Sequence, residues 1–150
     1  MSTIKVDTYL TRGGASEIAI DKLKGVSSAA SISVVGEGGT VTTNLQQGLC
    51  KAWSNIRYDS SAPNFTNGDS FNASSVADTA VGELTVTLSN NMANGVYACV
   101  ASTQDFAVEH QSPTLTTSTY GIRTIADSSG ARADVGNGTF VATIITGDLA

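Results

Sequence analysis

The sequence predicts an all-β protein with a C-terminal antiparallel β-sandwich head, jelly-roll-like, behind an N-terminal β-hairpin or extended arm. Several segments alternate apolar and polar residues with the period of a half-buried strand. Clusters of Gly, Asn, Asp and Pro separate these segments, and no amphipathic stretch of ten or more residues indicates a helix. We expect an attachment arm over 1–25, a Ser/Gly-rich stem or linker over 26–48, and the sandwich head over 49–150.

The arm is expected to be a small hairpin. Residues 4–10 alternate apolar and polar side chains, Gly13-Gly14 lies in the turn, and residues 17–21 form the returning strand. A three-residue loop places the apolar side chains of both strands on one face. Such a hairpin is not stable alone, so its apolar face must dock on this chain or on a partner. The candidate attachment or oligomer contacts are Ile4, Val6, Leu10, Ile18 and Ile20.

Residues 22–48 are poor in large side chains and leave two alternatives open. Ile32 and Val34 alternate with serines before a Gly-Glu-Gly-Gly turn, which is typical of a second short hairpin. The same composition fits an extended stem that becomes buried only when several copies wind together.

The head is expected to contain six strands joined by polar loops. The predicted strands span 49–58, 71–78, 83–89, 96–102, 119–126 and 139–146. The predicted loops span 59–70, 103–118 and 127–138. The segment 96–102 is almost entirely apolar, which predicts a strand covered on both faces.

The register of the hairpin over 71–89 has two alternatives. Leu84, Val86 and Leu88 share one face of its second strand. A four-residue loop would pair these with Ala77, Ser75 and Ala73, and a five-residue loop would pair them with Val76, Ser74 and Asn72.

Composition excludes several classes of function. Charged residues make up 14% of the chain, the net charge is −5, and eight basic residues are too few for a phosphate-binding patch. No apolar run approaches the roughly 20 residues that span a bilayer, and the N-terminus lacks the pattern of a secretory signal. We therefore expect no nucleic acid and no membrane among the partners. Cys50 and Cys99 lie in apolar strands, which predicts buried free thiols.

Chemistry-bearing residues form no motif. His110 is the one histidine and has no Cys at metal-ligand spacing, and no nucleophile motif surrounds Ser112. We expect no catalytic residue, no metal and no cofactor. Carboxylates at Asp69, Glu83, Glu109 and Asp127 leave a glycan-degrading enzyme as the weakest alternative. The polar loops instead supply candidate surface contacts at Asn64, Phe65, Asn67, Asp105, Phe106 and His110.

Three stretches resemble the short tail-fibre and fibre-like virion proteins of marine bacteriophages, of the cyanophage and pelagiphage type. They are the opening MSTIKVDT, the tripeptide Lys51-Ala52-Trp53, and the run DSFNASSVADTAVGELTVTLSNNM over 69–92, which the strand over 96–102 continues. Residues 22–48 lie outside the resemblance.

The resemblance implies a non-enzymatic virion protein, trimeric, attached by its arm and carrying the sandwich at its far end. Its expected partners are further copies of itself, other tail, neck or capsid proteins, and a host-surface glycan or protein. Its expected location is the virion, assembled in the cytoplasm of the bacterial host. A capsid or neck decoration protein is the principal alternative to a tail fibre.

Overall fold

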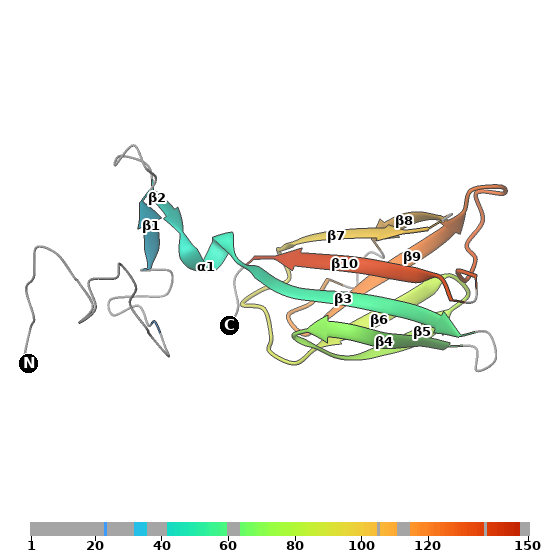
Figure 1. The fold of residues 1–150 in the computed structure, drawn as a ribbon, viewed down its shortest axis with the longest axis horizontal. Coiled ribbons are helices and arrows are strands. Elements are labelled where there is room, and N and C mark those ends of the chain that lie inside the picture. The colour runs from blue at the N-terminus through green and yellow to red at the C-terminus, as the bar shows by residue number, and fades with distance from the viewer. Residues whose placement is uncertain are drawn as a thin grey trace, which may run out of the picture.

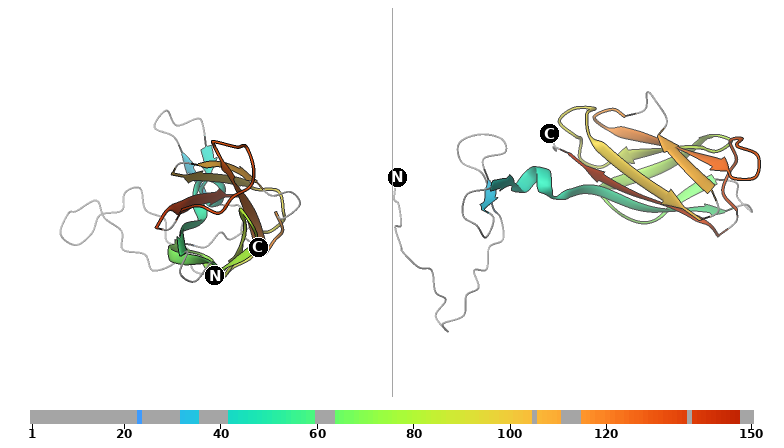
Figure 2. Two further views of the ribbon diagram at one scale, coloured as in Figure 1. Left: turned by 90° about the vertical axis from the view of Figure 1, so that its right-hand side faces the viewer. Right: turned by 90° about the horizontal axis from the view of Figure 1, so that it is seen from above.

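The head is a sandwich of two four-stranded antiparallel sheets. The computed structural model describes residues 23, 32–35, 42–59, 64–104, 106–110, 115–136 and 138–147. One sheet has the strand order β4-β3-β10-β7, with β3 (Cys50–Asp59), β4 (Asn64–Phe71), β7 (Ala98–Thr103) and β10 (Phe140–Thr146). The other has the order β5-β6-β9-β8, with β5 (Ala73–Ala80), β6 (Glu83–Leu88), β8 (Phe106–His110) and β9 (Thr119–Ala126). The sheets face one another in Figures 1 and 2, which confirms the predicted fold class.

Strand alternation accounts for the core between the sheets. Every second side chain of β6 (Leu84, Val86, Leu88) points inward and is buried, as the period of two requires. The same holds for β3, β9 and β10. The buried apolar side chains are Ala52, Ile56, Phe65, Leu84, Val86, Leu88, Met92, Tyr120, Ile122, Val135, Val141 and Ile145.

One polar cluster lies inside this core. Tyr120 of β9 is fully buried, and its hydroxyl lies 2.8 Å from Oγ1 of Thr143 and 3.3 Å from Oγ of Ser54. Thr143 and Ser54 belong to the facing sheet, so the three hydroxyls connect the two layers. A buried polar group is costly unless it has a hydrogen-bond partner. Here the Tyr120 hydroxyl is the partner of both Ser54 and Thr143.

The β5–β6 hairpin differs from both predicted registers. Its loop is only two residues, Val81-Gly82, and Ala80 is opposite Glu83. A bulge between Asp78 and Ala80 then puts Val76 opposite Val86, and a second between Ala73 and Ser75 puts Ala73 opposite Leu88, which agrees with the four-residue-loop alternative. Gly82 adopts φ +65°, which favours glycine and permits the tight turn.

Two of the predicted loops contain strands. β4 occupies most of the expected loop over 59–70, and β8 lies within the expected loop over 103–118. Both are edge strands, where one unpaired side tolerates polar and irregular sequence. The segment 96–102 also differs from expectation: β7 is an edge strand with alternating exposure, and its Val100 faces outward.

The chain crosses from one sheet to the other at Asn72, between β4 and β5. This residue has φ +57°, a conformation that Asn tolerates better than most residues. Its amide nitrogen donates to the carbonyl oxygens of Lys51 (3.0 Å) and Asn90 (3.1 Å), and its Oδ1 accepts from the Asn90 backbone N–H (2.7 Å). One side chain thereby fixes the corner to two other segments.

Replacing Asn72 should separate these two contributions. Asn72→Gly keeps the backbone conformation but loses the side-chain hydrogen bonds, and we expect it to lower the unfolding free energy by about 1–2 kcal/mol. Asn72→Ala adds backbone strain and should cost about 2–4 kcal/mol. Urea unfolding of the three proteins measures both. Equal stability of the Gly and Ala variants would contradict the role of the positive φ.

The described part of the stem lies beyond one end of the sandwich (Figures 1 and 2). It contains a two-stranded antiparallel ribbon, β1 (Ser33–Val35) with β2 (Thr42–Asn44), followed by one helical turn, α1 (Leu45–Gly48). β1 is exposed throughout, including Val34 and Val35. Of the two alternatives for 22–48, the described part agrees with the short hairpin. The apolar side chains of this hairpin, Val34 and Val35, are not covered by the head. The arm and its five candidate contacts, Ile4, Val6, Leu10, Ile18 and Ile20, lie outside the described residues.

Candidate interaction surface

The three predicted surface contacts in the first loop, Asn64, Phe65 and Asn67, all belong to β4. Phe65 is buried, with its ring centroid 5.1 Å from that of Tyr58, so its prediction as a surface contact is wrong. The reason is that β4 pairs with β3 and places this side chain inward. Asn67 is partly buried and donates from Nδ2 to Oγ of Ser70 (2.6 Å). Asn64 begins β4, opposite Asp59.

The other predicted contacts lie on the opposite edge of the sandwich. Phe106 begins β8 and packs partly buried against the core, and His110 ends the same strand with an exposed side chain. Asp105 lies outside the described residues. β4 packs beside β5 whereas β8 packs beside β7, so the structure does not bring the candidates of the two loops together.

Two carboxylates of the described residues, Glu83 and Asp134, are held in structural contacts. Glu83 is buried, lies 3.0 Å from Nε of Arg123 and also pairs with Arg132. Asp134 accepts hydrogen bonds from the Gly82 backbone N–H (2.7 Å) and the Tyr58 hydroxyl (3.5 Å). Desolvation and then the charge of Asp134 raise the pKa of Asp78. These contacts fasten the turn after β5 to the segment after β9.

Among the described residues, no cluster of three or more His, Cys, Asp or Glu side chains could hold a metal ion. No helix in the same residues is long and apolar enough to cross a membrane.

The two cysteines are free, but they differ in burial. Cys50 is exposed at the start of β3, so its predicted burial is wrong. Cys99 is partly covered on the inner face of β7, and desolvation raises the pKa of its thiol to about 12.

Cys99 should therefore react slowly with thiol reagents. In a Cys50→Ser variant at pH 8, we expect a disulfide exchange reagent to modify native Cys99 roughly a thousandfold more slowly than the urea-unfolded chain, because only the thiolate attacks and its fraction falls tenfold for each unit of raised pKa. Absorbance of the released thiol measures both rates. Comparable rates in the two states would show that Cys99 is not covered.

The most unusual surface is the outer face of the β4-β3-β10-β7 sheet. Trp53 is opposite Phe71 of β4 on one side and Ile144 of β10 on the other, and Ile144 is in turn opposite Val100 of β7. Their exposures are 38%, 51%, 52% and 66%, in the order Trp53, Phe71, Ile144, Val100. We call this row of four side chains, one from each strand, the apolar belt.

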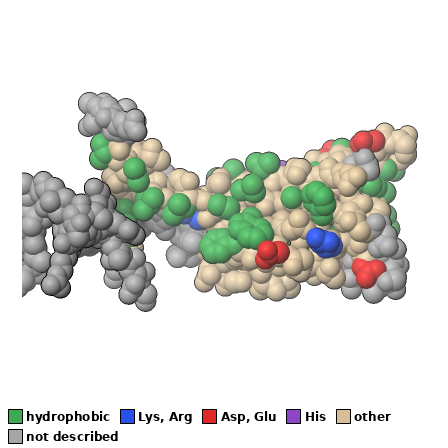
Figure 3. Space-filling view, viewed as in Figure 1, with side chains coloured by type: hydrophobic (Ala, Val, Ile, Leu, Met, Phe, Trp, Pro, Cys, Tyr) green, Lys and Arg blue, Asp and Glu red, His purple; other side chains and the backbone are tan. Residues whose placement is uncertain are grey.

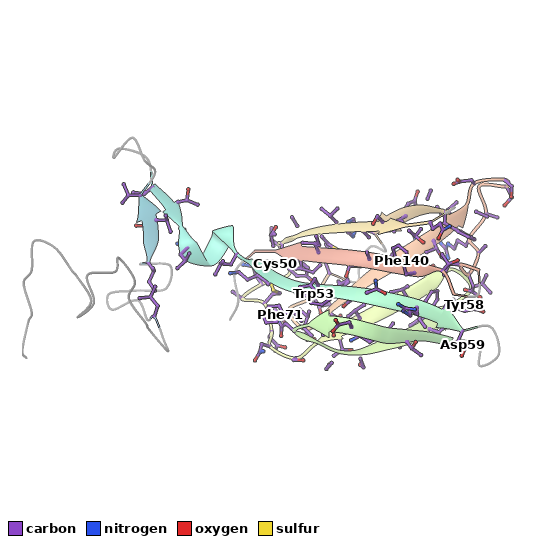
Figure 4. The ribbon with its side chains drawn as sticks, in the orientation of Figure 1. Cys50, Trp53, Tyr58, Asp59, Phe71 and Phe140 are labelled. Carbon is purple, nitrogen blue, oxygen red and sulfur yellow. The ribbon has the colours of Figure 1, made fainter. Side chains whose placement is uncertain are left out.

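The apolar belt lies toward the stem end of the head. Figure 4 shows Trp53 beside Phe71, with Cys50 on the stem side of them and Tyr58 and Asp59 at the far end. Figure 3 shows hydrophobic side chains gathered over the stem-side half of β3 and β4. The sequence contains the signal, since Trp53 falls on the face of its strand opposite Ala52 and Ile56. We predicted the strand over 96–102, which supplies Val100, to be covered on both faces and not to carry a surface.

Comparison of the chain with protein-family models, with curated proteins and with solved structures gave no match. The class of protein is described by the structure alone. The described part of the chain is an all-β sandwich head on a thin β stem, with an exposed apolar belt beside their junction.

Proposed function

We propose that this protein is a non-enzymatic structural component of a bacteriophage virion: a short trimeric tail fibre, attached to the particle by its N-terminal arm. The head then lies at the outer end and contacts the host surface. The resemblance over 1–8, 51–53 and 69–102 supports the assignment to a virion.

The observation that carries the proposal is the stem. A two-stranded ribbon is not stable in water on its own, and β1 buries none of its residues. Val34, Val35 and Leu49 remain exposed although all three are large and apolar. Winding three copies together would cover these side chains and supply the missing core, which is the reason for proposing an oligomer.

The layout of the head supports its outer position. β3 runs from the stem to Asp59 at the far end of the sandwich (Figure 4). The β5–β6 turn and the segment 127–134 lie at that far end too, because Asp134 accepts hydrogen bonds from the Tyr58 hydroxyl near the end of β3 and from the Gly82 backbone N–H in the turn. In a trimer these turns occur three times, so weak contacts with repeated host glycans or proteins add by avidity.

Mass measurement of the full chain tests the proposal first. Native mass spectrometry or sedimentation at micromolar concentration should give three copies, and labelling of purified virions with an antibody to the head should mark the tail. Label spread over the shell would favour a capsid decoration protein. A monomer at every concentration would reject the fibre, and release of sugar from host envelope by the purified protein would reject the non-enzymatic role.

A further inference from the structure

We infer that the apolar belt is an interface between copies of this chain, so that the stem-side halves of the heads pack together as well as the stems. The inference rests on the proposed function, since it names the surface that further copies cover. It identifies Trp53, Phe71, Ile144 and Val100 as contact residues between copies.

The first argument is the contrast between the outer faces of the two sheets. Outside the β5-β6-β9-β8 sheet, Thr85 is opposite Gly121, Thr87 is opposite Thr119, and the half-buried Arg123 pairs with the buried carboxylate of Glu83. These are small or polar side chains, as expected for a face in water. The outer face of the other sheet carries the apolar belt instead. The outer face of the β5-β6-β9-β8 sheet therefore resembles a solvent-exposed surface, whereas the outer face of the β4-β3-β10-β7 sheet resembles the core of a protein interface.

The second argument is continuity with the stem. Leu49 precedes β3, is exposed, and lies between the stem and the apolar belt along the chain. Val34 and Val35 continue the exposed apolar side chains into the ribbon. By contrast, the far half of β3 carries the charged Arg57 and Asp59, with one exposed apolar side chain, Phe140 of β10, opposite Arg57; Figure 4 labels Asp59 and Phe140 there. Copies that gather along their stems would thus bring the belts, and not the charged ends, nearest to one another.

The third argument is area. Four strands about 4.8 Å apart and seven residues long give a sheet face of roughly 19 Å by 24 Å, or about 450 Å². A specific interface usually buries about 800 Å² of each partner, so the sheet face alone is too small. Copies already joined by their stems face one another at high effective concentration, and a smaller contact then suffices. The belt therefore fits a second copy held in place by the stem better than an independent protein partner.

The composition of the row also favours protein over sugar. Ile144 at its centre and Val100 at its edge are branched aliphatic side chains that pack well against other side chains and offer no flat ring. None of the four has a side-chain hydrogen-bond acceptor; the polar side chains next to the row are Asn55 and Asp69, which are opposite one another on β3 and β4.

The chain contains its own probe of the belt, because Trp53 is its single tryptophan. In the full-length wild-type oligomer, acrylamide should quench Trp53 at least about threefold less than in diluted monomer, and its emission should shift to shorter wavelength. Ile144→Lys replaces the central side chain of the belt with a charge at an exposed position. We expect it to restore quenching and to raise the concentration needed for assembly by at least about tenfold.

Val81→Lys is the matched control. Val81 is apolar and exposed at the β5–β6 turn, far from the apolar belt. Like Ile144→Lys, the Val81→Lys variant loses an exposed branched aliphatic side chain and gains a positive charge. We expect wild-type mass and quenching from it. Thermal unfolding of both variants shows whether the head is folded. If Ile144→Lys does not fold, Val100→Lys on the edge strand β7 provides a second belt variant.

The outcomes separate this inference from the proposed function. A trimer in which Trp53 is as quenchable as in the monomer, and which Ile144→Lys leaves intact, overturns the belt interface while the fibre stands. A monomer at all concentrations overturns both. Shielding of Trp53 in the trimer only after a host-surface polysaccharide is added would make the belt a glycan site and overturn the inference.

Discussion

Tyr120→Ala is expected to lower the free energy of unfolding by about 3–5 kcal/mol, the range for removing a large buried aromatic side chain. Tyr120 is fully buried and belongs to the hydrophobic core between the two sheets. The truncation leaves a cavity and also removes the hydrogen-bond partner of Thr143 and Ser54. Urea or thermal unfolding measures the loss, which is a large share of the roughly 5–15 kcal/mol that stabilises a domain.

Two further variants divide this loss between packing and hydrogen bonding. Tyr120→Phe keeps the ring but leaves buried hydroxyls without their partner, and should cost about 1–3 kcal/mol. Adding Thr143→Val to Tyr120→Phe removes one of those hydroxyls with little change in volume and should recover part of the loss. If Tyr120→Phe were as stable as the wild type, the hydroxyl cluster would have no stabilising role.

Gly82→Ala is expected to cost about 2–5 kcal/mol, the second largest effect. A methyl group at Gly82 would lie 2.7 Å from the backbone nitrogen of Ala133 and 2.7 Å from the carbonyl oxygen of Thr124. Both are backbone atoms that cannot rotate away, so the turn must shift, which costs about 1–3 kcal/mol. The φ of +65° adds about 1–2 kcal/mol for any residue with a side chain.

Gly130→Ala is the matched control. Gly130 has nearly the same φ, +64°, but a methyl group there would meet nothing within 4 Å. It should cost only the conformational part, about 1–2 kcal/mol. The difference between the two variants in the midpoint of denaturant unfolding isolates the packing at Gly82. Equal losses would show that the β5–β6 turn is free to move away from Ala133 and Thr124.

The four central strands could be predicted from the sequence, and so could two of the edge strands, β5 and β7, whereas the edge strands β4 and β8 could not. β3, β6, β9 and β10 lie between two neighbours, so their inward side chains must be apolar and the alternation is clear. β4 and β8 each have one free side, and the Asn67-Gly68 pair in β4 indicates a turn although it forms a bulge. Bulges also made the register of β5–β6 unpredictable, because each of the two bulges shifts the pairing that is counted outward from the turn.

The surface was harder to predict than the fold. Loop composition indicated Phe65 as a surface contact, but aromatic side chains in short edge strands also close the core. The belt depends on registers across four strands, and only pairing places Trp53, Ile144 and Val100 in one row. Alternation shows that a strand has two apolar faces; it does not show whether a second layer covers both.

The position of β3 determines how the molecule would carry a mechanical load. This strand receives the chain from the stem and is hydrogen-bonded along its length to β4 on one side and β10 on the other. A pull on the stem while the far end of the head is held acts along β3, across hydrogen bonds that lie perpendicular to the strand. Both ladders must then shear at once, and no bond can break alone as it would in unzipping. The head should resist extension far better than its equilibrium stability suggests.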